Sequence, residues 1–126
     1  AGTIYNSWPL MGNSYFPDDN EFKNIFKINA FSDPSLVQFM HRNLAYIITV
    51  FYIFIFLKVY KNKIKNLYNV INILGAVLIL QIILGVLVLL FGAHIFYASM
   101  HQISSIFLVS FSIYFLYKNK KLTYSF

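Results

Sequence analysis

The chain has 126 residues, of which 59% are hydrophobic and 11% are charged, and its mean hydropathy is +0.63. This composition excludes an ordinary soluble domain, and the absence of cysteine excludes disulfides, thiolate metal sites and iron–sulfur clusters as properties of the chain. The formal net charge of +6 is compatible with nucleic-acid binding. However, most lysines of the chain lie directly beside apolar segments, which favours a membrane protein with no nucleic-acid partner.

The first predicted element is an outer-side loop over residues 1–33, which is too polar to span a membrane. It holds all four acidic residues and turn formers such as Pro9 and Pro17. We expect this loop to lie across the ends of the helices that follow. The chain begins at Ala1 without a targeting sequence, so we also expect that an upstream part is missing.

Three apolar segments follow, each long enough to cross a hydrocarbon core about 30 Å thick as a helix. They predict transmembrane helices over residues 34–57 and 70–92 and, within residues 93–117, an outer turn and a third helix. Asp33 followed by Pro34 is typical of a helix start. A capping-box pattern at Ser99 and Gln102 predicts that the third helix starts just before His101, but apolar residues from Ile95 allow an earlier start.

Lysines mark the two remaining elements, a basic inner loop over residues 58–69 and a basic inner tail over residues 118–126. By the positive-inside rule, both face the cytoplasm or the mitochondrial matrix. The sequence therefore predicts one all-α, multi-pass module over residues 1–126, in a bacterial plasma membrane or a mitochondrial inner membrane.

His41 and His101 form the strongest candidate site. His41 lies 17 positions before Lys58, and His101 lies 17 positions before Lys118. The first and third helices run in the same direction, so a rise of about 1.5 Å per residue places both imidazoles roughly 25 Å from the inner lysines. Two histidines at one depth on parallel helices can bind one metal from opposite sides.

The neighbours of the two histidines favour a flat ligand over a bare ion. Ala45 and Ser105 follow the histidines by four positions, which leaves room on the same helix faces. Glycines in the second helix permit close approach of a helix or a ring; they lie at positions 75, 85 and 92. No Asp or Glu lies within the spans, which disfavours zinc, whereas a six-coordinate haem needs only two axial side chains. The alternative of interfacial histidines and purely packing residues stays open.

Four further polar residues have interpretations of their own. Arg42 pairs either with a haem propionate or with a lipid phosphate. Gln38 either orients an imidazole or is a polar residue at the membrane edge. His94 is expected to be a solvated turn residue rather than a ligand, and Gln81 an interhelical hydrogen-bonding residue without a specific function.

With these residues in view, the chain resembles the carboxy-terminal half of the haem A synthase family. The matching segments are YNSWPLMG at 5–12, VQFMHRNLA at 37–45, QIILG at 81–85 and HQ at 101–102, together with AG at 1–2. Their order and spacing cover nearly the whole chain to about residue 117. Each segment alone is a weak signal, but the combination is specific.

The resemblance implies a fold, an activity and partners. The family has eight transmembrane helices in two related four-helix bundles and oxidises a methyl group of haem O to the formyl group of haem A for cytochrome oxidase. This chain then supplies three helices of a haem-binding bundle whose first helix is missing. His41 and His101 become the axial ligands of a resident haem b, with Arg42 as a third cofactor-binding residue. The implied partners are haem O, the bilayer, the missing amino-terminal half, haem O synthase and an electron donor.

One position separates the two halves of the family. The substrate-oxidising half has a glutamate three residues before its first histidine, and Gln38 holds that position here. Glutamine cannot transfer a proton as a carboxylate can. We therefore expect no catalytic residue in this chain, an electron-transfer or structural role for its haem, and no activity of the chain alone.

Two other functions stay open. One is a haem-bearing membrane anchor subunit of a respiratory complex such as succinate dehydrogenase. The other is a structural membrane subunit descended from the enzyme, which keeps the helices but binds no haem.

Overall fold

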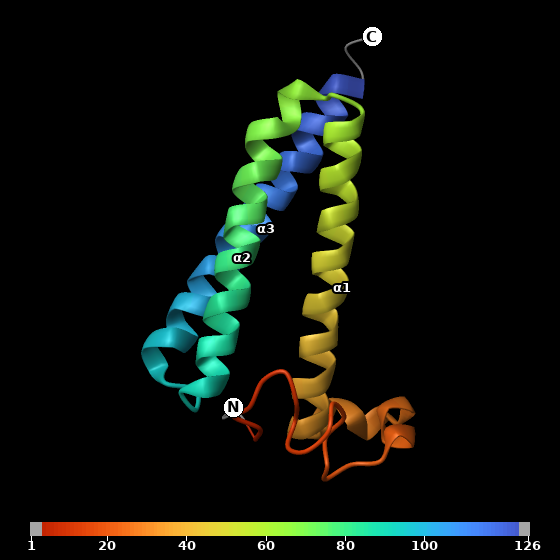
Figure 1. Cartoon of the computed structure of the whole chain (residues 1–126), viewed down its shortest axis with the longest axis vertical. Coiled ribbons are helices and arrows are strands. Elements are labelled where there is room, and N and C mark those ends of the chain that lie inside the picture. The colour runs from red at the N-terminus through yellow and green to blue at the C-terminus, as the bar shows by residue number, and fades with distance from the viewer. Residues whose placement is uncertain (1–3, 124–126) are drawn as a thin grey trace.

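The computed structural model describes residues 4–123, and the described residues hold helices but no β-strand. The long helices are α1 (Pro34–Lys61), α2 (Tyr68–Leu90) and α3 (Ile95–Thr123); the short 3-10 helices are η1 (Phe22–Phe26), η2 (Ile28–Ser32) and η3 (Lys65–Leu67). Figure 1 shows α1 and α3 running in the same direction, with α2 antiparallel to both. We call the end at which α1 and α3 begin the loop end, and the opposite end the lysine end. Residues 1–2 of the resemblance and 124–126 of the predicted tail lie outside the described residues.

The start of α1 confirms the predicted cap. The Asp33 carboxylate accepts hydrogen bonds from the backbone N–H groups of Ser35 (3.0 Å) and Leu36 (3.1 Å), and Pro34 occupies the first helical turn. The helix continues to Lys61, beyond the predicted span boundary at residue 57. Backbone hydrogen bonding does not stop where the apolar segment stops, and lysines in a last turn complement the negative end of the helix dipole.

A sharp turn joins α2 to α3. Gly92 has a φ of +63°, and the N–H of Ala93 donates to the carbonyl of Val88 (2.8 Å). This pattern is a Schellman motif, in which a residue with positive φ closes the helix. Because α3 begins at Ile95, the predicted capping box at Ser99 is wrong, and Ser99 lies inside the helix.

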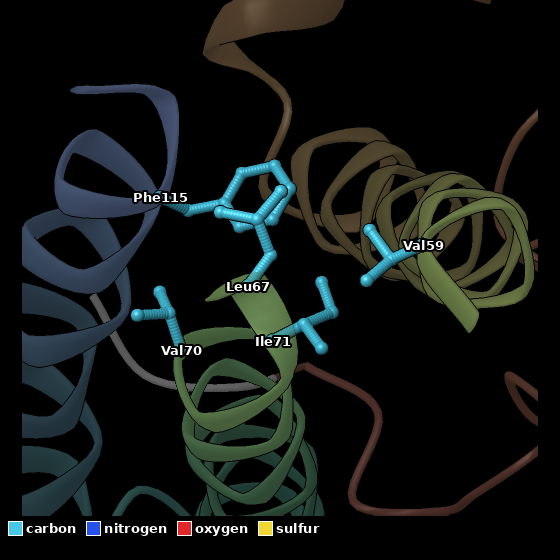
Figure 2. Packing of buried hydrophobic residues seen from close by; sticks show 5 residues of the cluster. All are labelled: Val59, Leu67, Val70, Ile71 and Phe115. Carbon is cyan, nitrogen blue, oxygen red and sulfur yellow. The ribbon is translucent and has the colours of Figure 1, made fainter. Parts of the chain in front are cut away.

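The main cluster of buried apolar side chains lies at the lysine end, where all three helices meet (Figure 2). Its members are Val59, Leu67, Val70, Ile71 and Phe115. The Tyr52 hydroxyl of α1 also donates to the carbonyl of Ile71 in α2 (2.9 Å) and lies against Gly75, whose missing side chain leaves room for it. Towards the loop end, α1 diverges from α2 and α3 (Figure 1).

The three long helices are long and apolar enough to cross a membrane. Few residues in the apolar part of each candidate span are buried inside the protein. The buried share is 6% for Pro34–Lys61, 22% for Lys65–Leu90 and 11% for Ile95–Lys121. Large side chains such as Ile47 and Phe51 face outward. A surface of this kind needs lipid or further helices around it, as the predicted membrane bundle requires.

Candidate functional site

The structure brings the two predicted histidines together at the loop end. His41 lies in the second turn of α1, His101 lies in the second turn of α3, and their ring centroids are 6.3 Å apart. The ring planes are inclined by 79°. Two imidazoles that bind one metal from opposite sides, through bonds of about 2 Å, have centroids roughly 6 Å apart. The spacing therefore fits a shared metal between the two rings.

A hydrogen-bond network from α2 holds the His101 ring. Its Nδ1 lies 3.1 Å from the Gln81 backbone carbonyl, and its Nε2 lies 3.3 Å from the Gln81 side-chain nitrogen. A carbonyl only accepts, so Nδ1 carries the proton and Nε2 presents its lone pair. The Ser104 hydroxyl donates to the other atom of the Gln81 amide, Oε1. Nε2 is thus the nitrogen of His101 whose lone pair could bind a metal, and in this structure it faces the Gln81 amide.

Gly85 supplies the space in which the His101 ring lies. A Cβ atom added at this glycine would stand 3.1 Å from Cε1 of His101 and 3.6 Å from its Nδ1. Of the three glycines predicted to allow close approach, Gly85 is the one beside the candidate site; Gly75 contacts Tyr52, and Gly92 forms the turn.

Gln38 binds the outer loop rather than an imidazole. Its Nε2 donates to the Tyr5 carbonyl (2.7 Å), and its Oε1 accepts from the N–H groups of Tyr5 (3.2 Å) and Ile4 (3.3 Å). The amide therefore serves as both donor and acceptor to one stretch of backbone. A glutamate here could accept from these N–H groups but, when ionised, could not donate to the carbonyl.

Arg42, one turn after Gln38, is 7% exposed and also binds the loop. Its terminal nitrogens donate to four backbone carbonyls, which belong to Ser7 (2.8 Å), Leu10 (3.1 Å), Tyr5 (3.4 Å) and Pro9 (3.4 Å). Its Nε has no hydrogen-bond partner among the described residues. The burial of Arg42 beneath the loop disfavours the lipid-phosphate interpretation. The guanidinium charge is left without a carboxylate within the described chain.

A second set of polar contacts ties the loop to the start of α1. The Ser35 hydroxyl (2.6 Å) and the Tyr5 hydroxyl (2.9 Å) both donate to the Asp19 carboxylate. These bonds, led by that from Ser35, lower the pKa of Asp19 below its usual 3.8 although partial burial opposes them. Burial and the bond to Asp19 raise the pKa of Tyr5 above its usual 10.0. Both shifts favour an ionised Asp19 and a protonated Tyr5, which are the forms in which the Tyr5 hydroxyl donates to the Asp19 carboxylate.

Other residues considered from the sequence lie elsewhere or act locally. His94 is exposed, and its Nδ1 accepts from the backbone N–H of Phe96 (3.3 Å). The Ser105 hydroxyl donates to the carbonyl of Gln102 (2.6 Å) within α3. No group of three or more His, Asp or Glu side chains that could hold a metal ion occurs in the described part of the chain. The site is therefore a histidine pair.

One contributor to the site was not identified from the sequence, and the role of another was predicted only in part. Gln81 bonds between helices as expected, but it also contacts His101 through both its backbone and its side chain, which was not expected. Ser104 was not considered, although its place three residues after His101 puts it on nearly the same helix face. The signal for Gln81 was present, because it is a polar residue in an otherwise apolar span.

Comparisons with known proteins place this chain in a family. A family model described as "Cytochrome oxidase assembly protein" matches residues 1–113, which include both histidines. The "Heme A synthase" of Pelagibacter ubique (strain HTCC1062) is 39% identical over 119 residues, covering 94% of this chain and 35% of the relative. That of Rickettsia bellii (strain OSU 85-389) is 40% identical over 121 residues, with 94% and 36% covered.

The "Heme A synthase" of Wolbachia pipientis wMel is 39% identical over 125 residues, covering 99% of this chain and 34% of the relative. The chain thus spans about a third of the length of the curated relatives it matches. No solved structure matches it. The matched residues confirm the resemblance drawn from the sequence, and the chain belongs to the cytochrome oxidase assembly protein family.

Proposed function

We propose that this chain is the carboxy-terminal, haem b-binding part of a haem A synthase. In the proposed enzyme, the methyl group of haem O is oxidised to the formyl group of haem A for cytochrome c oxidase. His41 and His101 are the residues that would hold one haem b. The observation that carries the proposal is the 6.3 Å separation of the two imidazole rings, on two helices of a chain that belongs to this family.

Each residue of the site has a distinct task in this proposal. The Gln81 carbonyl keeps the proton of His101 on Nδ1, so that Nε2 would be the nitrogen that binds the haem iron. Gly85 leaves room for the ring. Because the Gln81 amide lies 3.3 Å from the same Nε2, this amide must give way when a metal binds there. A haem bound by two histidines supplies one-electron transfer.

Arg42 is the proposed third cofactor-binding residue, as a partner of a haem propionate. Its buried charge and its unpaired Nε support an anionic partner near the histidines. Its terminal nitrogens are already engaged by loop carbonyls. We therefore propose that Arg42 links the loop to the cofactor and attracts the propionate mainly through its charge.

No catalytic residue is proposed in this chain. Gln38 cannot transfer a proton as a carboxylate can, and its amide is used to bind the Tyr5 backbone. Substrate oxidation then belongs to the remaining part of the protein. We expect the purified 126-residue chain to leave haem O unchanged, and formation of haem A by this chain alone would contradict the division of labour.

The setting of the site is part of the proposal. The lysine end faces the bacterial cytoplasm or the mitochondrial matrix, and the loop end faces the opposite side. Haem O, haem O synthase, an electron donor and the remaining part of the enzyme are the proposed partners. The family match does not favour the alternative of a succinate dehydrogenase anchor. The other alternative, a structural membrane subunit that binds no haem, is distinguished from the proposal by the following experiment.

The test is the reduced-minus-oxidised visible spectrum of the purified protein and of three single variants. We expect a low-spin haem signal in the unchanged protein and its loss in His41→Ala and in His101→Ala. His94→Ala is the matched control, because this exposed histidine bonds only within its own turn, and it should keep the signal. A signal that survives both site substitutions, or no signal in the unchanged protein, would sink the proposal.

A further inference from the structure

The short helices η1 and η2, residues 22–32, carry large apolar side chains that face away from the protein. Phe22 is 64% exposed, Phe26 80%, Ile28 90% and Phe31 77%. All four precede Pro34 and therefore lie outside the candidate membrane spans. Exposed apolar surface on this scale indicates a partner that covers it.

The orientation of this segment is fixed by its contacts with the start of α1. Ala30 is buried, and the Asn20 side chain donates to the Asp33 carboxylate that caps α1 (3.1 Å). Asn24, inside η1, donates in turn to the Asn20 side chain (3.2 Å). The polar and small residues thus hold the segment to the helix cap, which leaves the phenylalanines and Ile28 on the outer side.

A row of aromatic rings joins the segment to α1. The ring centroids of Phe39 in α1 and Phe16 are 5.0 Å apart, those of Phe16 and Phe22 are 5.7 Å apart, and those of Phe22 and Phe26 are 6.0 Å apart. Figure 1 shows the segment (orange) extending crosswise from the start of α1, on the side away from α2 and α3. A segment perpendicular to a spanning helix, at its end, runs parallel to the membrane surface.

The charges of the segment suit the same surface. Lys23 and Lys27 are both exposed and alternate with the apolar residues, and Lys23 also pairs with Glu21. Aromatic rings are enriched at the membrane–water interface, and lysines extend their charged ends towards headgroups. Basic residues beside an apolar face favour contact with anionic lipid.

We propose that residues 22–32 form an interfacial anchor that lies in the lipid headgroup layer at the loop end. Phe26, Ile28 and Phe31 enter the upper acyl region, and Lys27 contacts phospholipid phosphates. The occupant is the bilayer because the segment extends away from the other helices and its aromatic row continues onto α1, a candidate spanning helix. The anchor goes beyond the proposed haem function and does not depend on it.

Because the chain contains no cysteine, single labelling sites can test this anchor. The environment-sensitive fluorophore NBD is attached to Phe26→Cys, and the protein is placed in nanodiscs of phosphatidylcholine and phosphatidylglycerol. Lipids carrying a nitroxide at the headgroup, at a shallow acyl position or at a deep acyl position then act as quenchers. Asn13→Cys, in an exposed part of the loop, and Phe51→Cys, midway along α1, are the reference sites.

The Phe26 probe should lose most intensity with the shallow nitroxide and should be protected from aqueous iodide relative to the Asn13 probe. The Phe51 probe should lose most with the deep nitroxide. Iodide quenching equal to that at Asn13 would place the segment in water, and protection from both iodide and lipid nitroxides would place it against protein. Either result overturns the anchor. Ile28→Cys repeats the measurement independently of Phe26.

Discussion

At the scale of single residues, the geometry of His101 depends on the neighbouring helix. Gln81 sets the tautomer of the ring, and Gly85 leaves the space for it. The position of the proposed ligand His101 is therefore expected to be sensitive to substitutions that leave both histidines in place.

Replacing Gly85 with alanine tests this dependence. A Cβ atom 3.1 Å from Cε1 of His101 must displace the ring, so we expect Gly85→Ala to lower the haem content of the purified protein. Gly75→Ala is the matched control, because its Cβ meets the Tyr52 hydroxyl near the lysine end. That variant should lose thermal stability but keep the haem spectrum of the remaining folded protein. Equal haem loss in both variants would contradict the role of Gly85.

The loop is docked by an ionisable residue, Asp19, which predicts a pH dependence. Its pKa is lower in the folded protein than the usual 3.8, so the ionised form stabilises docking above that pH. This contribution is lost as the pH falls through the lower folded value. We expect Trp8 in the loop to change its fluorescence in this acidic range and Asp19→Asn to remove the dependence.

Ser35→Ala removes the largest cause of the Asp19 shift and should move that transition to higher pH. Ser105→Ala removes a hydroxyl whose bond stays within α3, and it should leave the transition unchanged. A transition that is the same in all three variants would assign the pH dependence to another group.

At the scale of the elements, the helix ends were only partly predictable from the sequence. The cap of α1 was predicted correctly, because Asp33 and Pro34 are adjacent and act within one turn. The start of α3 was not fixed, because Ser99 and Gln102 have the spacing of a capping box but lie inside the helix. A local capping pattern therefore identifies a helix start only where the helix does not continue on the amino-terminal side of the pattern.

The turn after α1 contains a backbone conformation that the sequence does not predict. Lys63 has a φ of +53°, and its neighbour Ile64 donates from its N–H to the carbonyl of Val59 (3.0 Å). Residues other than glycine adopt this left-handed conformation at a cost of about 1 kcal/mol or more. The basic loop thus places a lysine where glycine is favoured.

Lys63→Gly should therefore raise the free energy of unfolding by about 1 kcal/mol. Lys61→Gly, in the last turn of α1, should lower it by about 1 kcal/mol, because glycine is unfavourable inside a helix. Thermal unfolding in detergent compares the two variants. Shifts of the same sign would contradict the role assigned to the turn.

At the scale of the whole molecule, the sequence predicted the spans, the histidine pair and a loop across the helix ends, but not the contacts that dock this loop. Apolar runs and lysine boundaries place the two histidines at one depth, and their rings are indeed 6.3 Å apart. The bonds from Arg42 and Gln38 to the loop join residues more than 30 positions apart. These long-range hydrogen bonds depend on the path of the loop, and this path cannot be predicted from local sequence periodicity. The contact between Gln81 and His101 likewise depends on how α2 packs against α3.

The central claim is that His41 and His101 bind one haem. Low-temperature electron paramagnetic resonance of the oxidised protein tests it most directly, because the signal reports the axial ligands of ferric iron. The account predicts a low-spin ferric signal, as two imidazole ligands would give. A high-spin ferric signal from the purified protein, or no ferric haem signal, would contradict it.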